Sequence, residues 1–151
     1  MMNENDEFIN FSFSVLPSNT SGSVAIPLTL SPTPTTLATL TMRSGCDCNC
    51  AVALNATVGW LAVANGTGLE RVDVLFKIWR GVPLTNLVFS ALDSAESGFD
   101  SRKLTSFNHV DTRFGSSRFY TYYLTAELPN IGSAATVIGP ITFTATEIEG
   151  G

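Results

Sequence analysis

The longest alternation of apolar and polar residues in this chain is CDCNCAVALNATVGW, from Cys46 to Trp60. Every second residue in it is a cysteine, an aliphatic residue or tryptophan, and the residues between them are small or polar. Successive side chains of a β-strand point to opposite faces of a sheet, so this period of two predicts a long amphipathic strand. Because a single strand rarely exceeds about ten residues, we expect a bend or bulge inside the stretch.

The same period of two recurs on both sides of this stretch, and helical spacing does not. Alternating segments run over Ile9–Val15, Val24–Leu30, Val72–Ile78 and Tyr120–Leu128, and Ala134–Ile148 provides one or two closing strands around Gly139-Pro140. Proline has no backbone N–H, so Pro27 predicts an edge strand. Phe99–Phe114 has no clean period and is not assigned.

Turn-forming residues separate these segments at intervals typical of a β-sandwich. The sequence therefore predicts an all-β fold, an antiparallel β-sandwich or jelly roll of about eight strands. We expect residues 1–16 to form an N-terminal arm and residues 17–151 to form a single domain, since no repeat or linker divides the chain.

The composition is poor in charge, with 44% hydrophobic and 14% charged residues and a net charge of −5. The eight lysines and arginines are scattered, so a nucleic acid is not an expected partner. A surface with few charges repels its own copies weakly and suits tight packing against other proteins. We expect no membrane span and no classical signal peptide, because long apolar runs are absent and Met1–Glu7 carries acids without a base.

The N-terminal arm alternates strongly, with apolar residues on one face of its predicted strand. An amphipathic strand at a sheet edge can pair with the open edge of a neighbouring subunit. It can equally form the first strand of its own sandwich, and both interpretations remain open. The residues predicted to act in assembly are Phe8, Ile9, Phe11, Phe13 and Val15.

Three cysteines stand two residues apart, at Cys46, Cys48 and Cys50. On one strand they would point to the same side about 7 Å apart, which is poor geometry for bonding one another. Cross-links to another chain are one interpretation, and small buried thiols in the core are the other. A metal site would need further ligands, and His109, the single histidine, has no supporting spacing. We predict no metal and no cofactor.

Candidate catalytic residues are few. His109 lies near Asp111, Ser106 and Ser116, but one histidine among scattered serines is more typical of a surface residue than of a triad. We therefore expect no enzymatic activity. The acidic residues of one region are interpreted either as solvated surface or as a cation-binding loop: Asp93, Glu96, Asp100 and Asp111.

Six aromatic residues are interpreted either as core and cross-strand pairs or as a sugar-binding platform: Trp60, Trp79, Phe119, Tyr120, Tyr122 and Tyr123.

Three segments resemble strands of small jelly-roll proteins on the spore surfaces of Bacillus and Clostridium relatives: Val72–Arg80, Val88–Ser90 and Tyr120–Thr125. The cysteine run and the alternating arm resemble endospore-appendage subunits, which the resemblance implies are joined by a flexible N-terminal connector through disulfides. The tumour-necrosis-factor-like tip domains of exosporium filaments are a third comparison. The chain departs from the appendage pattern because residues 1–16 contain no cysteine.

These features lead to one main hypothesis, a self-assembling structural subunit of a filament or surface layer at a cell or spore surface. Its expected partners are copies of itself or other surface proteins, joined by N-terminal strand addition and by disulfides. A lectin-like or receptor-binding tip domain is the alternative. A viral or phage jelly-roll coat protein is the third possibility.

Overall fold

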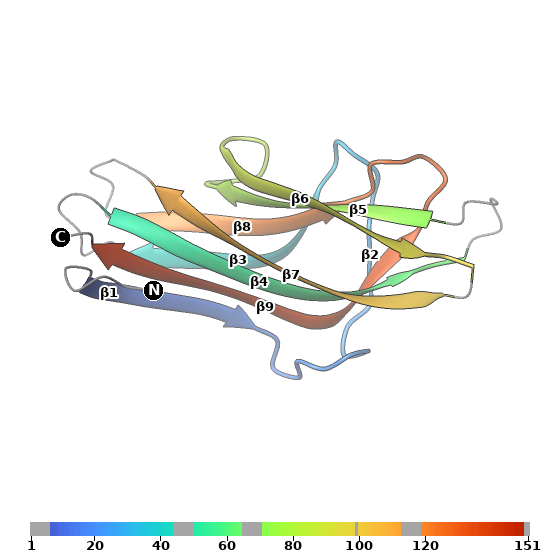
Figure 1. Ribbon diagram of the computed structural model, residues 1–151, viewed down its shortest axis with the longest axis horizontal. Coiled ribbons are helices and arrows are strands. Elements are labelled where there is room, and N and C mark those ends of the chain that lie inside the picture. Colours follow the sequence, from blue (N-terminus) through green and yellow to red (C-terminus); the bar gives the residue numbers. More distant parts are fainter. Residues whose placement is uncertain (1–6, 44–49, 65–70, 99, 113–118, 150–151) are drawn as a thin grey trace.

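The protein was analysed as a computed structural model, which describes residues 7–43, 50–64, 71–98, 100–112 and 119–149. These residues form two antiparallel sheets that pack face to face, so the predicted β-sandwich is confirmed (Figure 1). One sheet has the order β1-β9-β4-β7 with β2 beside β9, and the other has the order β3-β8-β5-β6. The strands are β1 (Glu7–Val15), β2 (Ile26–Pro27), β3 (Thr35–Arg43), β4 (Cys50–Ala62), β5 (Arg71–Arg80), β6 (Leu87–Glu96), β7 (Ser101–Thr112), β8 (Phe119–Glu127) and β9 (Ala135–Glu149).

The core lies between the sheets and is built from the alternating residues that the sequence pattern selects. The predicted inward residues of β5 and β8 are all buried, which confirms the period of two in both strands. β9 and β4 complete the opposite wall of the core. The largest fully buried side chains include Trp60, Tyr122, Phe76, Phe143, Leu40 and Met42.

The irregularity expected inside the longest alternation lies on its partner strand instead. Val58 of β4 pairs with Ile141 and Trp60 pairs with Val137, so the extra residues belong to β9, while β4 pairs with β7 without a shift in register. At this point the backbone of Gly59 lies against Gly139. A Cβ atom at position 59 would lie 2.0 Å from the carbonyl oxygen of Gly139. Glycine is therefore required at this crossing of the two strands.

Several predicted boundaries change in the structure. The strand expected over Val24–Leu30 is reduced to β2, which pairs with β9 at the sheet edge as Pro27 indicated. The unassigned segment Phe99–Phe114 contains a full-length strand, β7, and the closing segment is one continuous strand, β9. Within the described residues, the structure contains no helix long and apolar enough to cross a membrane.

The two sheets meet at their edges, where β1 lies against β3 and β6 lies against β7. β1 forms the lower edge of the molecule in Figure 1, beside β9. Both β1 and β3 are edge strands of their own sheets. The inward side of β1 consequently meets the edge of another strand instead of the middle of the apolar core.

Candidate functional site

The N-terminal segment forms β1 and pairs antiparallel with β9 of its own chain. The apolar side chains that the structure describes in it do not enter the core. Phe11, Phe13 and Val15 are 49%, 62% and 47% exposed, and they lie opposite the outward-facing threonines of β9. Of the other two residues predicted to act in assembly, Phe8 and Ile9, the structure describes the backbone but not the side chains.

The opposite side of β1 is polar and donates hydrogen bonds to backbone carbonyl groups at the edge of β3. The Ser12 hydroxyl donates to the carbonyl of Thr41 at 3.2 Å, and the Asn10 amide donates to the carbonyl of Arg43. An apolar side chain in either place would leave a carbonyl of the β3 edge without this donor. The packing of the two sheets therefore turns the polar face of β1 inward and its apolar face to solvent.

The outward surface of the β1-β9-β4-β7 sheet, called here the outer face, has a regular pattern of large and small side chains. Strand pairing places Phe13, Thr144, Asn55 and Asn108 in one row across the four strands. The neighbouring rows are Phe11, Thr146, Ala53 and Val110 on one side and Val15, Thr142, Thr57 and Ser106 on the other.

Across the three rows just described, the large apolar residues of the outer face stand on its two edge strands. β1 contributes a ridge of Phe11, Phe13 and Val15, and β7 contributes Val110 and, beyond these rows, Leu104, which are 55% and 60% exposed. Between these edges, the central part of β9 and β4 forms a trough of threonine, alanine and asparagine side chains, and the larger outward residues Ile148, Leu61 and Ile138 stand toward its two ends. A flat sheet surface with exposed aromatic residues is the kind of patch that marks interaction sites on soluble proteins.

Charge is nearly absent from the outer face. Among the described side chains that these four strands direct outward, Arg102 is the one that carries a charge. Hydroxyl groups of the trough also hydrogen-bond within the molecule: Thr57 Oγ1 lies 2.9 Å from Ser106 Oγ, and the Asn19 amide donates to Thr142 Oγ1 at 2.9 Å. These groups can be covered with little loss of hydrogen bonding.

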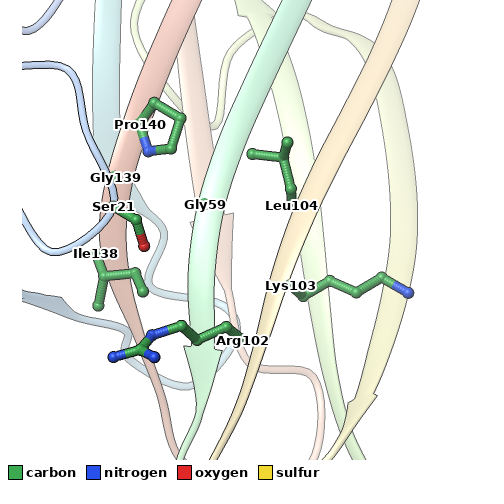
Figure 2. A pocket seen from close by; sticks show the side chains of 8 residues that line it. All are labelled: Ser21, Gly59, Arg102, Lys103, Leu104, Ile138, Gly139 and Pro140. Carbon is green, nitrogen blue, oxygen red and sulfur yellow. The ribbon is translucent and has the colours of Figure 1, made fainter.

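The trough ends in a shallow depression of about 290 Å³ around Gly59 (Figure 2). Gly59 forms its floor because glycine has no side chain, with Gly139 and Pro140 of β9 on one side and Leu104 of β7 on the other. Arg102 extends over β4 toward Ile138, whereas Lys103 points away (Figure 2).

The outward side of the second sheet buries polar groups. Trp79 Nε1 donates to Thr125 Oγ1 at 2.9 Å, and Lys77 Nζ lies 2.9 Å from Glu127 Oε1. The same Lys77 ammonium lies 5.5 Å from the centre of the Trp79 ring. Glu127 is 1% exposed, and its Oε2 atom has no hydrogen-bond partner among the described residues. The negative charge of the buried Glu127 carboxylate is therefore balanced by the Lys77 ammonium.

The residues considered as a catalytic triad do not come together. Ser106 and His109 alternate onto opposite faces of β7, and His109 stacks on Phe89 with 5.1 Å between ring centres. Asp111 instead joins the two sheets, because it accepts hydrogen bonds from Arg80 Nε at 3.0 Å and from the Tyr122 hydroxyl at 2.6 Å. The bond to Asp111 raises the pKa of Arg80. Ser116 lies outside the described residues.

Two further carboxylates are held in hydrogen-bond networks. The Ser94 hydroxyl, then Asn130 and Arg71, lower the pKa of Asp73, although burial acts in the opposite direction. Burial also acts to raise the pKa of Asp93, but hydrogen bonds from Thr105 and the Ser94 backbone, together with Lys103, outweigh it and lower the pKa.

Three acidic residues of the region from Asp93 to Asp111 have different partners and do not form one cluster. Asp93 contacts Lys103 and Thr105, Asp100 accepts from the Ala64 amide at 2.7 Å, and Asp111 is paired with Arg80. The described residues contain no group of three histidine, cysteine or acidic side chains that could hold a metal ion.

The aromatic residues considered as a sugar-binding platform are mostly buried. Trp60 and Tyr122 are 0% exposed, and Trp79 and Tyr120 are 5% exposed. Trp60, Tyr120 and Tyr122 belong to the core between the sheets, and Trp79 is buried on the outward side of the second sheet. Phe119 is exposed and Tyr123 is half-buried. The structural interpretation of these residues therefore holds for four of the six.

Of the three cysteines, the structure describes Cys50, which begins β4 and is buried. Cys50 is disulfide-bonded. The role of the three cysteines in cross-linking stays a prediction. Cys46 and Cys48 lie outside the described residues.

No protein family model and no curated protein matches this chain. The candidate site therefore rests on the residues themselves. Sequence patterning located the ridge of β1 but missed the trough, which combines alternate residues of two strands far apart in the chain. The signal for the trough is the threonine repeat Thr142, Thr144 and Thr146, which alternates with the apolar residues Ile141, Phe143 and Ala145.

Proposed function

We propose that this protein is a structural subunit that assembles with copies of itself. The observation that carries this proposal is the outward direction of the β1 ridge, where Phe11 and Phe13 are 49% and 62% exposed. A monomer gains nothing from an aromatic ridge in water, whereas a neighbour that covers it removes apolar surface from solvent. Two phenylalanines and a valine half-exposed to this extent offer roughly 300 Å² of apolar area, or about 7 kcal/mol before association costs.

Strand exchange is the proposed way in which β1 takes part. β1 is an edge strand, and a segment from Leu16 to Ala25 joins it to β2. If β1 pairs with β9 of a neighbour, the contacts of Asn10 and Ser12 with β3 are made again between two chains at little cost in free energy. The ridge then lies on the neighbour's outer face.

The proposed architecture is a jelly roll. When the two-residue β2 is left out, the strand order becomes first-eighth-third-sixth in one sheet and second-seventh-fourth-fifth in the other. This order, with β1 against β3 and β6 against β7 at the corners, supports the jelly-roll proposal over other sandwiches.

An extended filament or layer needs a second contact, and the turn between β5 and β6 offers one. Val82, Leu84 and Leu87 are 57%, 64% and 49% exposed there. Leu84 also has a positive φ of 73°, which is unusual for a branched residue and indicates a turn whose shape is imposed by its surroundings. Location at a cell or spore surface, partner surface proteins and intermolecular disulfides remain part of the proposal on the strength of the resemblance.

The test is to measure mass in solution and to image the full chain and a variant without residues 1–16. Multi-angle light scattering and negative-stain microscopy should detect oligomers or fibres for the full chain and monomers for the truncated one, with circular dichroism reporting strand content. The double variant Phe11→Ser/Phe13→Ser provides a second test if the truncated chain does not fold. A full chain that stays monomeric at millimolar concentration contradicts the proposal, and a truncated chain that still assembles removes β1 from it.

A further inference from the structure

The geometry points to one particular contact: the outer face of the β1-β9-β4-β7 sheet packs against the same face of a second copy, with the ridge of one copy in the trough of the other. This inference rests on the proposed self-assembly and names the surface that performs it. The ridge is Phe11, Phe13 and Val15, and the trough is formed by β4 and β9.

The shape of the outer face favours a second copy as the occupant. Its ridge stands on the edge strand β1, and opposite this ridge the central rows of the two adjacent strands carry small side chains, with Ala53, Asn55 and Thr57 on β4. A two-fold axis parallel to the strands and passing over β9 carries β1 of each copy over β4 of the other. Rotation about this axis does not move a residue along the strand direction, so Phe13 of one copy lies over Asn55 of the other copy.

The electrostatics favour the same occupant. The chain carries a net charge of −5, so two copies repel each other wherever their acidic surfaces meet. The outer face avoids this repulsion because Arg102 is the one charged side chain that the described parts of its strands direct outward. A strongly charged partner would find no complementary charges in the trough, whereas a second copy brings an equally uncharged surface.

The size of the contact follows from the three strands that face each other, β1, β9 and β4. From Ala51 to Leu61, β4 spans about 35 Å, and three strands are about 14 Å wide, which makes a contact of roughly 500 Å² in projection. A stable dimer buries about 800 Å² of accessible surface on each partner, and a textured face exposes more area than its projection. Closely packed sheets lie about 10 Å apart, a distance that phenylalanine side chains over a trough of small residues can fill.

Internal hydrogen bonds lower the penalty for covering two of the hydroxyl groups of the trough, those of Thr57 and Thr142. Thr57 is bonded to Ser106 and Thr142 is bonded to Asn19, both at 2.9 Å within one molecule. These side chains keep their bonds when a partner excludes water. The depression at Gly59 continues the trough and leaves room for side chains at the end of the ridge.

The experiment is sedimentation-velocity measurement of the full chain and four single variants, with circular dichroism as the folding control. Ala53→Trp fills the trough and Phe13→Lys places a charge on the ridge, and each should weaken self-association at least about 100-fold. Val110→Lys lies on the same face but on β7, beyond the contact, and Leu92→Lys, 58% exposed, lies on the other sheet. Both of these should associate like the parent.

Each outcome supports or overturns the inference. Loss of association in Ala53→Trp and Phe13→Lys, with Val110→Lys and Leu92→Lys unchanged, supports it. If all four variants associate like the parent, the protein still assembles but not through this face, so the inference fails and the proposed function survives. If Val110→Lys weakens association and Ala53→Trp does not, the ridge-in-trough arrangement is wrong. A parent chain that is monomeric overturns both proposals.

Discussion

Adding a single methyl group at Gly59 should lower the stability of the fold strongly. In Gly59→Ala the added methyl group would lie 2.0 Å from the Gly139 oxygen, 2.6 Å from its carbonyl carbon and 2.9 Å from Pro140 Cδ. The first two are backbone atoms, so rotation of a side chain cannot relieve the overlap. Real Cβ contacts essentially never fall under 3.0 Å, so the carbonyl has to move by about 1 Å.

That movement is opposed by the loop on the other side of β9. The amides of Gly22 and Val24 both donate to the carbonyl of Ile138, at 2.9 and 3.3 Å. A shift of Gly139 weakens these bonds, each worth about 0.5–1.5 kcal/mol, in addition to about 1–3 kcal/mol for overpacking. We expect Gly59→Ala to lower the free energy of unfolding by about 3–5 kcal/mol, a large share of the stability of a domain of this size.

Urea denaturation followed by the fluorescence of the buried Trp60 measures this loss. Gly98→Ala is the matched control, because its Cβ meets nothing within 4 Å and no positive φ is recorded there, and it should change stability by less than about 0.5 kcal/mol. Gly22→Ala has the same open space but a φ of +87°, so it isolates backbone strain and should cost about 1 kcal/mol. If Gly59→Ala is as stable as the Gly98→Ala control, the close crossing of β4 and β9 is not rigid and the reasoning is refuted.

Three further predictions concern the buried charges. The lowered pKa of Asp73 means that its contribution to stability is present above its ordinary value of 3.8 and is lost as the pH falls through the lower folded value. Asp73→Asn should therefore be less stable than the parent at neutral pH and should lose less stability on acidification; equal slopes in urea titrations between about pH 5 and pH 2 would contradict this. Lys77→Met leaves the 1%-exposed Glu127 carboxylate without its cation and should cost about 3–5 kcal/mol at pH 7, whereas Lys77→Met/Glu127→Leu should recover most of the loss. Thermal unfolding of both variants checks this, and a double variant no better than the single one would count against it. Arg80→Met removes the partner of Asp111 between the sheets and should cost about 3 kcal/mol, measured by urea denaturation; a change under about 0.5 kcal/mol would mean that the pair adds nothing to the packing of the sheets.

The core strands could be predicted because their two faces differ strongly in hydrophobicity. In β5, Val72, Val74, Phe76 and Ile78 form the apolar face and Asp73 and Lys77 lie on the other, so the alternation identifies the strand and its inward face together. The irregularity expected inside β4 was wrong in its place, because the extra residues lie on β9, opposite Gly59. β7 was missed, because its inward side at the sandwich edge holds Thr105 and Asp111, whose hydrogen bonds to Trp60 and Arg80 replace apolar contacts.

The sequence by itself determined that this chain is a β-sandwich, which segments form most of its strands and that β1 has one apolar and one polar face. It did not determine which face of β1 turns inward, because a period of two is the same in either orientation. The tertiary structure decided that point: the edge of β3 presents backbone carbonyls, which need donors such as Ser12 and Asn10. The apolar face consequently turns to solvent beside a trough that exists only because β4 and β9 pair across most of their length.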